Sequence, residues 1–301
     1  MKKNILITGG SGLLGKQLTQ ALLNRGYLVS HLSRSRGKDP KVKTFLWDVD
    51  KEEIDEHCID GVDVIIHLAG AGIADKRWSD ERKAQILDSR TKSIALIYAL
   101  MRTKANRINT VISASGVGYY SDRGDELLTE SSRPADDFIG SCCVAWEKAV
   151  DEGTEFDLRI VKYRTGVVLS LGGGALPQLA APVKFAVGSP LGTGKQWISW
   201  IHEQDVVDMY LLGLEDDKIS GVYNMAAPHP VTNSELTKAV AKQLHRPLWA
   251  PNVPAFIIKM LFGEMASLVL GSTKVSAQKI TAAGFEFKYP DVASALQEIY
   301  G

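Results

Sequence analysis

The stretch Ile5–Gly15 reads Ile-Leu-Ile-Thr-Gly-Gly-Ser-Gly-Leu-Leu-Gly, and it decides the fold class of the chain. Its glycines Gly9, Gly12 and Gly15 have the spacing G-x-x-G-x-x-G between a predicted strand and a predicted helix. Gly9 permits a tight turn, Gly12 lets a pyrophosphate approach the backbone, and Gly15 lets the helix pack against the sheet. The pattern predicts the nucleotide-binding turn of a Rossmann sheet.

The helix after this turn is predicted to bind the phosphates of the nucleotide. Backbone amide groups at a helix N-terminus, here near Leu13 and Leu14, are suited to an anion. Leu14, Leu18 and Leu22 follow at spacings of four residues, which indicates a helix with one face on a sheet. A glycine-rich turn without a nucleotide is the alternative, and the orderly succession of strand, turn, helix and second strand argues against it.

The end of the second predicted strand indicates which dinucleotide binds. An NAD site usually has Asp or Glu there, about 20 residues after the glycine turn, to hold the ribose 2′-hydroxyl. Ser33 takes that place here, and Arg34 and Arg36 follow it. Arginine side chains can meet a 2′-phosphate. We therefore expect NADP(H), with a solvated basic loop as the alternative.

The first half of the chain alternates short β-branched runs with amphipathic helical segments, which is typical of a parallel sheet with crossover helices. The expected strands are 4–8, 28–33, 44–47, 62–68, 110–113 and 157–163. The predicted fold class is α/β, a Rossmann doubly wound parallel sheet with a smaller mixed C-terminal substrate lobe. Residues 1–163 are expected to form the NADP-binding domain, completed by about 204–226, and 164–301 mainly the lobe.

The composition excludes several classes of partner. Lys plus Arg number 35 and Asp plus Glu number 35, so the formal net charge is zero. This balance gives no electrostatic case for nucleic acid or an anionic membrane. No run of about 20 apolar residues is present, so nothing is expected to span a bilayer. The N-terminal segment is expected to be the first core strand and not a signal peptide.

The cysteines predict a reducing compartment. Cys58, Cys142 and Cys143 are too few for a disulfide framework, and adjacent residues on a helix point about 100° apart. The reduced cytoplasm is therefore the expected location. No group of His, Cys and carboxylate residues has the spacing of metal ligands, so we expect no metal.

The second half has no flexible linker, so the two halves are expected to pack tightly. A helix that starts at Pro254 is rich in apolar residues, among them Phe256 and Met260. We expect this helix to be buried in the core. The alternative is a dimer face, which leaves a homodimer as one expected partner.

The chain resembles the extended short-chain dehydrogenase/reductases. It is most similar to an atypical subgroup, the "epimerase family" proteins described as nucleoside-diphosphate-sugar epimerase-like, through features that run from Arg77-Trp78 to the block Ala227–Tyr300. Trp146-Glu147 and the segment Arg164–Leu169 are among them. The further cofactor contacts that the resemblance implies are Asp48, Val49, Leu68, Ala69, Gly70 and Ser113.

The resemblance implies a proton-transfer site that this chain alters. In the wider family a Ser or Thr polarises the substrate oxygen, and Tyr-x-x-x-Lys on one helix face transfers the proton. Ser115 fits the first role. Counting back from Glu147 puts Cys143 at the Lys position and Ile139 at the Tyr position. Neither side chain can perform that chemistry, since one lacks a proton and the other a fixed positive charge.

Three interpretations of the altered site remain open. In the first, Tyr119 or Tyr120 supplies the proton beside Ser115. In the second, Cys143 is a nucleophile or a redox-sensitive thiol, and a small residue packed against the cofactor is the favoured alternative. In the third, the protein binds NADP(H) without turnover.

A substrate cleft is expected in the segment Lys195–His202, where tryptophans could stack on a ring and polar groups could orient a substrate. The candidate substrate contacts are Trp78, Lys195, Gln196, Trp200 and His202. Ordinary core tryptophans and a structural histidine are the alternatives. Arg77, Lys83 and Arg90 are candidates for an anionic group.

The function expected from these observations is that of an NADP(H)-binding oxidoreductase or epimerase-like protein that acts on a small molecule. The rival interpretation is a non-catalytic NADP(H)-binding sensor, or an assembly or regulatory protein.

Overall fold

An eight-stranded sheet is the centre of the computed structural model, which describes residues 2–37 and 39–301. The strand order is β12-β8-β6-β5-β1-β2-β3-β4, and all neighbours are parallel except β3 and β4. The strands are β1 Asn4–Thr8, β2 Leu28–Ser33, β3 Lys43–Asp48, β4 Glu53–Ile54, β5 Val64–His67, β6 Thr110–Gly116, β8 Arg159–Thr165 and β12 Gly221–Met225. The chain reverses its direction of winding at β1, which places the glycine turn at the switch point where ligands of such sheets bind.

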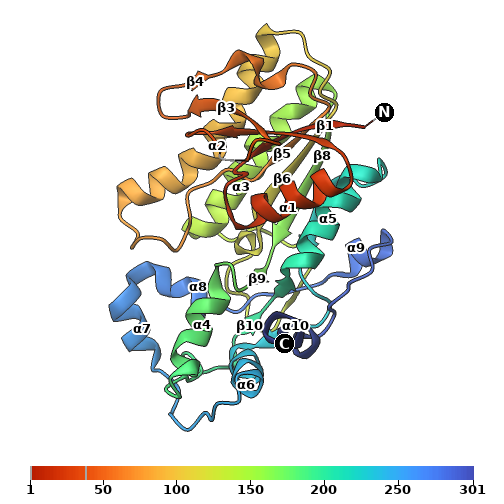
Figure 1. Ribbon diagram of the computed structural model, residues 1–301. Helices are drawn as coiled ribbons and strands as arrows, with labels where there is room; N and C mark the ends of the chain where they lie inside the picture. The colour runs from red at the N-terminus through yellow and green to blue at the C-terminus, as the bar shows by residue number, and fades with distance from the viewer. Residues whose placement is uncertain (1, 38) are drawn as a thin grey trace.

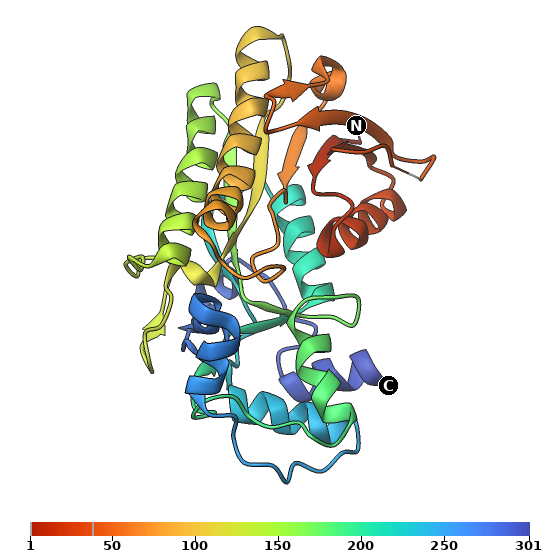
Figure 2. The same cartoon turned by 90° about the vertical axis from the view of Figure 1, so that its left-hand side faces the viewer.

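Helices cover both faces of the sheet (Figures 1 and 2). Helices α1 (Leu13–Asn24) and α5 (Glu203–Glu215) pack on one face, and α2 (Asp80–Thr103) and α3 (Phe138–Asp151) pack on the other. Alternate residues of β1 supply the two cores because successive side chains of a strand point to opposite faces. The predicted α/β Rossmann fold is therefore confirmed.

The strands agree with the predicted ones at their centres and differ at their ends. β1 and β2 have the predicted bounds, whereas β6 continues three residues beyond 113. It does so because its pairing with β8 continues through Ser115–Arg164 and Gly116–Thr165. This extension places Ser115 in the sheet and not in a loop.

A smaller lobe lies below the sheet in Figure 1. Its core joins α4 (Ala175–Lys184), α6 (Asn233–Gln243) and α10 (Val292–Tyr300). Its short strand pairs are β9 (Val167–Leu169) with β11 (Trp200–His202), β10 (Trp197–Ile198) with β13 (Val231–Thr232), and β7 (Leu127–Leu128) with β14 (Lys274–Val275). The remaining helices are α7 (Ala255–Phe262), α8 (Ser267–Leu270) and α9 (Gln278–Ala282). The domain boundaries stay a prediction, although α5 and β12 belong to the central sheet layer.

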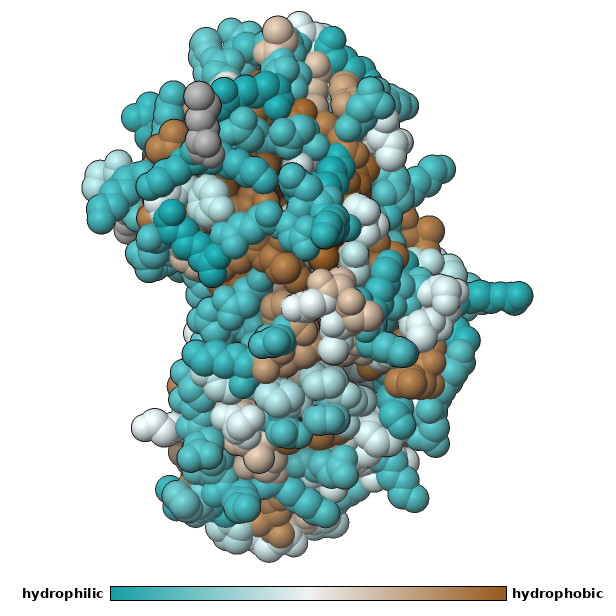
Figure 3. Space-filling model, turned by 90° about the vertical axis from the view of Figure 1, so that its right-hand side faces the viewer, coloured by the Kyte–Doolittle hydropathy of each residue, from teal (hydrophilic) through white to brown (hydrophobic). Residues whose placement is uncertain are grey.

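Helix α7 is not the buried core helix that we expected. Phe256 is 70% exposed and Met260 is 67% exposed, whereas only Ile258 of this helix is buried. By contrast, the side of the molecule that faces away from α7, seen in Figure 3, is covered mostly by hydrophilic side chains. The error arose because a continuous apolar run gives no information about what covers it. No helix in the described part of the chain has the length and apolar character needed to cross a membrane.

Candidate functional site

The glycine turn leaves the N-terminus of α1 free to bind an anion. Gly9 has φ +72°, and a Cβ on it would lie 2.8 Å from the Leu68 carbonyl oxygen. A Cβ on Gly15 would collide with the carbonyl oxygen of Gly9. Gly12 begins the helix without a side-chain cap, and the first turn holds no acidic residue. The first amide groups of the helix, near Leu13 and Leu14, are thus available to a phosphate.

The ends of β2 and β3 lie on one side of this turn. Ser33 is half-buried at the end of β2, and Arg34 after it is exposed. Asp48 ends β3, and its carboxylate accepts hydrogen bonds from the amides of Asp50 (3.1 Å) and Lys51 (3.2 Å). The hydrogen bond from the Lys51 amide lowers the pKa of Asp48, so this carboxylate carries its charge at neutral pH. Val49 packs against the core beside it.

The turn after β5 lies on the other side and is fixed by a residue that the sequence did not single out. The Thr8 hydroxyl accepts hydrogen bonds from the amides of both Leu68 and Ala69, each at 3.1 Å. Gly70 follows, and a Cβ there would lie 3.2 Å from the Arg90 guanidinium carbon. This turn therefore reaches the same edge of the sheet as Gly9.

Ser113 does not face the edge, contrary to our expectation of a cofactor contact. It has no exposed surface, and its hydroxyl lies 3.2 Å from Nδ1 of His67. The other ring nitrogen of His67 lies 2.8 Å from the Ser93 hydroxyl. Burial lowers the pKa of His67 to about 3, so the ring stays neutral. Ser113 thus belongs to a buried polar cluster beneath the site.

Ser115 belongs to a hydrogen-bonded network at the carboxyl ends of three adjacent strands. It pairs in register with Arg164 of β8, which pairs with Asn224 of β12. The Ser115 hydroxyl donates to Oε1 of Glu147 at 2.7 Å. Arg164 donates to both carboxylate oxygens of Glu147, from Nε at 2.8 Å and from Nη2 at 2.9 Å. A bidentate pair of this kind fixes both side chains.

The charges of this network are buried but matched. The Arg164 side chain is 4% exposed and that of Glu147 is 9% exposed. Burial alone would lower the pKa of Arg164, but the hydrogen bonds and charge of Glu147 raise it above its ordinary value. Arg164 is therefore charged in the folded protein.

The two tyrosines differ in what they can do. Tyr120 has no exposed surface, and its hydroxyl donates to Oδ1 of Asn224 at 2.7 Å and accepts from Nη1 of Arg164 at 2.9 Å. Burial raises its pKa to about 12. This geometry corrects the expectation that Tyr120 could act as an acid, because its hydroxyl is enclosed by protein. Tyr119 is half-buried, and the Arg164 guanidinium lies 3.3 Å from the centre of its ring.

Besides Glu147, helix α3 places two uncharged side chains near Gly118, at the positions that correspond to the usual Tyr and Lys. Ile139 is 7% exposed and Cys143 is 8% exposed, and both pack against Gly118. Burial raises the pKa of the Cys143 thiol to about 12. A thiol that is protonated at neutral pH is a poor nucleophile. The geometry therefore agrees with the small packed residue that we favoured over a reactive cysteine.

Three of the candidate substrate residues are structural. Trp200 is fully buried and donates from Nε1 to the carbonyl of His229 at 3.0 Å. Gln196 is 7% exposed and donates to the carbonyls of Leu191 and Val269, each at 3.0 Å. His202 is the third. These contacts correct our expectation, because polar groups already bound inside the protein are not free for a ligand.

His202 caps a helix instead of facing a cleft. Its Nδ1 accepts from the Gln204 amide at 3.0 Å at the start of α5, and Nε2 lies 2.9 Å from Glu298. It is 2% exposed. Trp78 and Lys195 keep surface for a ligand: Trp78 is half-buried edge-to-face with Phe138 at 5.0 Å, and Lys195 is exposed.

Comparison with known proteins identifies the family. A model of the NAD dependent epimerase/dehydratase family matches residues 5–226, and a domain of unknown function, DUF1731, matches residues 253–299. The chain belongs to the NAD dependent epimerase/dehydratase family. The resemblance found in the sequence is thereby confirmed.

Relatives of this family member cover its whole length. Epimerase family protein YfhF of Bacillus subtilis (strain 168) is 36% identical over 98% of this chain and 97% of its own. The chloroplastic epimerase family protein SDR39U1 homolog of Arabidopsis thaliana is 35% identical over 98% of this chain and 86% of its own. The crystal structure of human epimerase family protein SDR39U1 with NADPH covers 99% of both chains, with 29% identity and a TM-score of 0.86.

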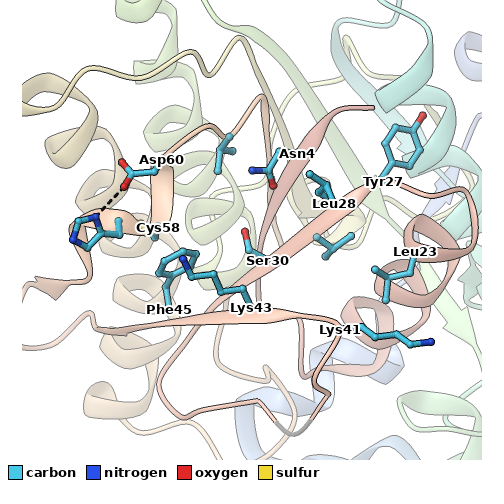
Figure 4. A pocket seen from close by; sticks show the side chains of 13 residues that line it. Asn4, Leu23, Tyr27, Leu28, Ser30, Lys41, Lys43, Phe45, Cys58 and Asp60 are labelled. Atoms are coloured by element: carbon cyan, nitrogen blue, oxygen red, sulfur yellow. Dashed lines mark hydrogen bonds and ion pairs between the residues drawn. The ribbon is translucent and has the colours of Figure 1, made fainter. Parts of the chain in front are cut away.

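The hollow in Figure 4 lies away from the family's nucleotide edge. Its volume is about 310 Å³, and Asn4 and Leu28, the first residues of β1 and β2, line it together with Phe45. The glycine turn follows the opposite ends of these strands. We therefore do not place the dinucleotide in this hollow, since ligands of open parallel sheets bind at the carboxyl ends.

No group of three or more His, Cys, Asp or Glu side chains that could hold a metal ion occurs in the described ranges 2–37 and 39–301. Sequence reasoning found Ser115 but missed the role of Arg164 and Asn224. The available signal was weak: Arg164 directly follows the predicted strand 157–163, and Asn224 lies in the segment of about 204–226 that was expected to complete the domain.

Proposed function

We propose that this family member binds NADP(H) and uses it to transfer hydride to or from a small molecule. The carrying observation is the uncapped N-terminus of α1 behind Gly12, with Arg34 exposed at the end of the neighbouring strand and no carboxylate at Ser33. The relative solved with NADPH supports the choice of dinucleotide. Bound NADP(H) supplies hydride chemistry. The reduced cytoplasm stays the predicted location, in keeping with three free, buried cysteines.

The protein groups suited to the proton are Ser115 and Tyr119. The Ser115 hydroxyl is held by Glu147, which orients it at the carboxyl edge of β6. Tyr119 lies under the Arg164 guanidinium, and this cation–π contact holds its ring in place. Arg164 thus connects the two candidates. In this proposal Ser115 orients the substrate oxygen and Tyr119 exchanges the proton with it.

A second function is favoured by a separate observation. Ile139 and Cys143 supply neither the phenol nor the fixed positive charge of the usual proton-transfer pair, and the Ser115 proton is already donated to Glu147. These contacts suit a protein that binds NADP(H) as a sensor or assembly factor without turnover.

The first experiment is calorimetric titration of the purified protein with NADPH and with NADH, repeated for Arg34→Ala. We expect NADPH to bind more tightly than NADH, and Arg34→Ala to remove most of that preference because the 2′-phosphate loses its cation. Lys51→Ala is the matched control, since it removes another exposed cation near the same strands. Equal affinity for the two dinucleotides would exclude the assignment to NADP(H).

A second experiment separates turnover from binding alone. Ser115→Ala with Tyr119→Phe is tested for NADPH affinity and for its effect in cells that lack the wild-type gene. If the function is chemical, the double variant binds NADPH normally and fails to restore the cells. If binding is the whole function, the double variant restores them and only Arg34→Ala fails.

A further inference from the structure

Arg90 is a half-buried cation without a carboxylate partner in the part of the chain that the structure describes. Its Nη1 donates to the carbonyl oxygens of Ile86 at 2.8 Å and Ala71 at 3.1 Å. Its Nε and Nη2 donate to no described residue. Burial lowers the pKa of Arg90, and no carboxylate offsets this effect. A partly desolvated cation with free donors is suited to an anionic ligand, whose counter-charge would offset the cost of its partial burial.

The surroundings hold this guanidinium in one orientation. It lies 5.0 Å from the centre of the Trp146 ring, in a cation–π contact, and its carbon would be 3.2 Å from a Cβ on Gly70. Arg90 is thus fixed between the turn after β5 and the helix that faces Ser115.

The order of the strands indicates which part of a bound dinucleotide would lie next to Arg90. Arg34 and Asp48 mark the 2′-phosphate and adenine side, at the ends of β2 and β3. Gly12 marks the pyrophosphate beside β1. Because the order is β3-β2-β1-β5-β6, the other half of an extended dinucleotide must run past β5 towards Ser115 on β6. Arg90 lies along that second half.

We propose that Arg90 binds the nicotinamide half of the dinucleotide and donates from its guanidinium to phosphate and ribose oxygens there. This inference rests on the proposed function. It gives the site a cation from α2, whereas α3 has Cys143 at the position of the usual Lys. Arg164 cannot take this role, because both oxygens of Glu147 already neutralise it.

The test compares a whole ligand with its adenine half. The full-length protein and its Arg90→Met and Arg90→Lys variants are titrated calorimetrically with NADPH and with adenosine 2′,5′-bisphosphate, which lacks the nicotinamide half. We expect Arg90→Met to weaken NADPH binding about tenfold or more while the bisphosphate affinity stays within about twofold. Arg90→Lys should recover part of the loss because it keeps the charge.

Arg102→Met is the matched control. Arg102 is on the same helix, is stacked on Phe156 at 5.4 Å, and lies about 18 Å further along the axis. It should bind both ligands as the wild type does. Thermal unfolding of each variant reports whether it folds, and if Arg90→Met does not fold, the ratio of the two affinities in Arg90→Lys decides.

Two results would overturn the proposal. Unchanged NADPH affinity in Arg90→Met would show that Arg90 does not contact the ligand. Equal losses for NADPH and the bisphosphate would show that Arg90 only shapes the turn at Gly70. Failure of the wild type to bind either ligand is a different result, since it refutes the proposed function itself.

Discussion

Glu147 and Arg164 stabilise the candidate site as a pair, because each charge is buried and each is hydrogen-bonded to the other. We expect Glu147→Leu or Arg164→Met alone to lower the free energy of unfolding by about 3–5 kcal/mol, since either removes the hydrogen-bonded partner of a buried charge. After Arg164→Met, Glu147 keeps only Lys162, at 4.0 Å, as a counter-charge. The double variant should lose much less than the sum of the two. Urea unfolding of the four proteins measures this coupling, and additive losses would contradict it.

His67 makes the stability of the protein dependent on pH in a defined direction. Its pKa is lowered by burial to about 3 in the folded state, against about 6.5 when unfolded. Between these values the unfolded chain binds a proton that the folded chain does not, so stability falls as the pH falls below about 6.5. From pH 7.5 to 5.5 this group alone should remove about 1.4 kcal/mol.

Urea unfolding at pH 7.5 and pH 5.5 tests this expectation with His67→Gln. The variant should lose about 1.4 kcal/mol less than the wild type over that interval. His57→Gln is the control, because the His57 side chain is 64% exposed. An equal pH dependence in wild type and His67→Gln would show that His67 is not the neutral buried group described above.

At the residue scale, sequence alone could predict positions defined by local backbone chemistry but not those defined by contact. Gly9, Gly12 and Gly15 follow from spacing because each has a local reason to lack a side chain. The ion pair between Glu147 and Arg164 joins residues 17 positions apart on different elements, and no local sequence pattern predicts it. Trp200 was misassigned for the same reason, since stacking on a ligand and packing in a core require the same side chain.

At the scale of elements, strand centres were predictable because β-branched runs bounded by turns are local signals. Strand ends were not, because pairing partners set them: β6 continues to Gly116 as far as β8 pairs with it. Helix α7 shows the corresponding limit for helices. Its apolar run predicted a helix correctly, but burial depends on what lies opposite, and nothing in the described chain covers Phe256.

The exposure of α7 predicts how its substitutions affect stability. Phe256→Ser and Met260→Ser should change the free energy of unfolding by less than about 0.5 kcal/mol, because both side chains are largely in solvent. Ile258→Ala, on the buried side of the same helix, should cost about 2–4 kcal/mol. Guanidinium unfolding of the three variants measures this difference. A large loss in Phe256→Ser would show that α7 is covered in solution, as a homodimer would cover it.

At the scale of the whole molecule, hydrogen bonds between segments distant in sequence join the sheet to the lobe. The Asn224 side chain accepts from Tyr120 and donates to the carbonyls of Leu128 and Ser276. Asp205 of α5 accepts from the amides of Lys288 and Tyr289 near the C-terminus. Because α5 and β12 come from the second half of the chain, the sheet is complete only when both halves have folded.

This dependence predicts that a fragment of residues 1–163 does not fold alone. The fragment contains seven of the eight strands of the sheet: it lacks β12, and its β8 is two residues short. The fragment lacks α5, whose buried residues Val206, Met209 and Tyr210 cover one face of the sheet. An open apolar face of this size should leave a collapsed state that lacks fixed packing. We expect the fragment to keep far-ultraviolet circular dichroism, to lose the near-ultraviolet signal and to bind ANS, whereas the full chain unfolds in one cooperative transition. A cooperative transition in the fragment would instead show that the sheet is independent of the lobe.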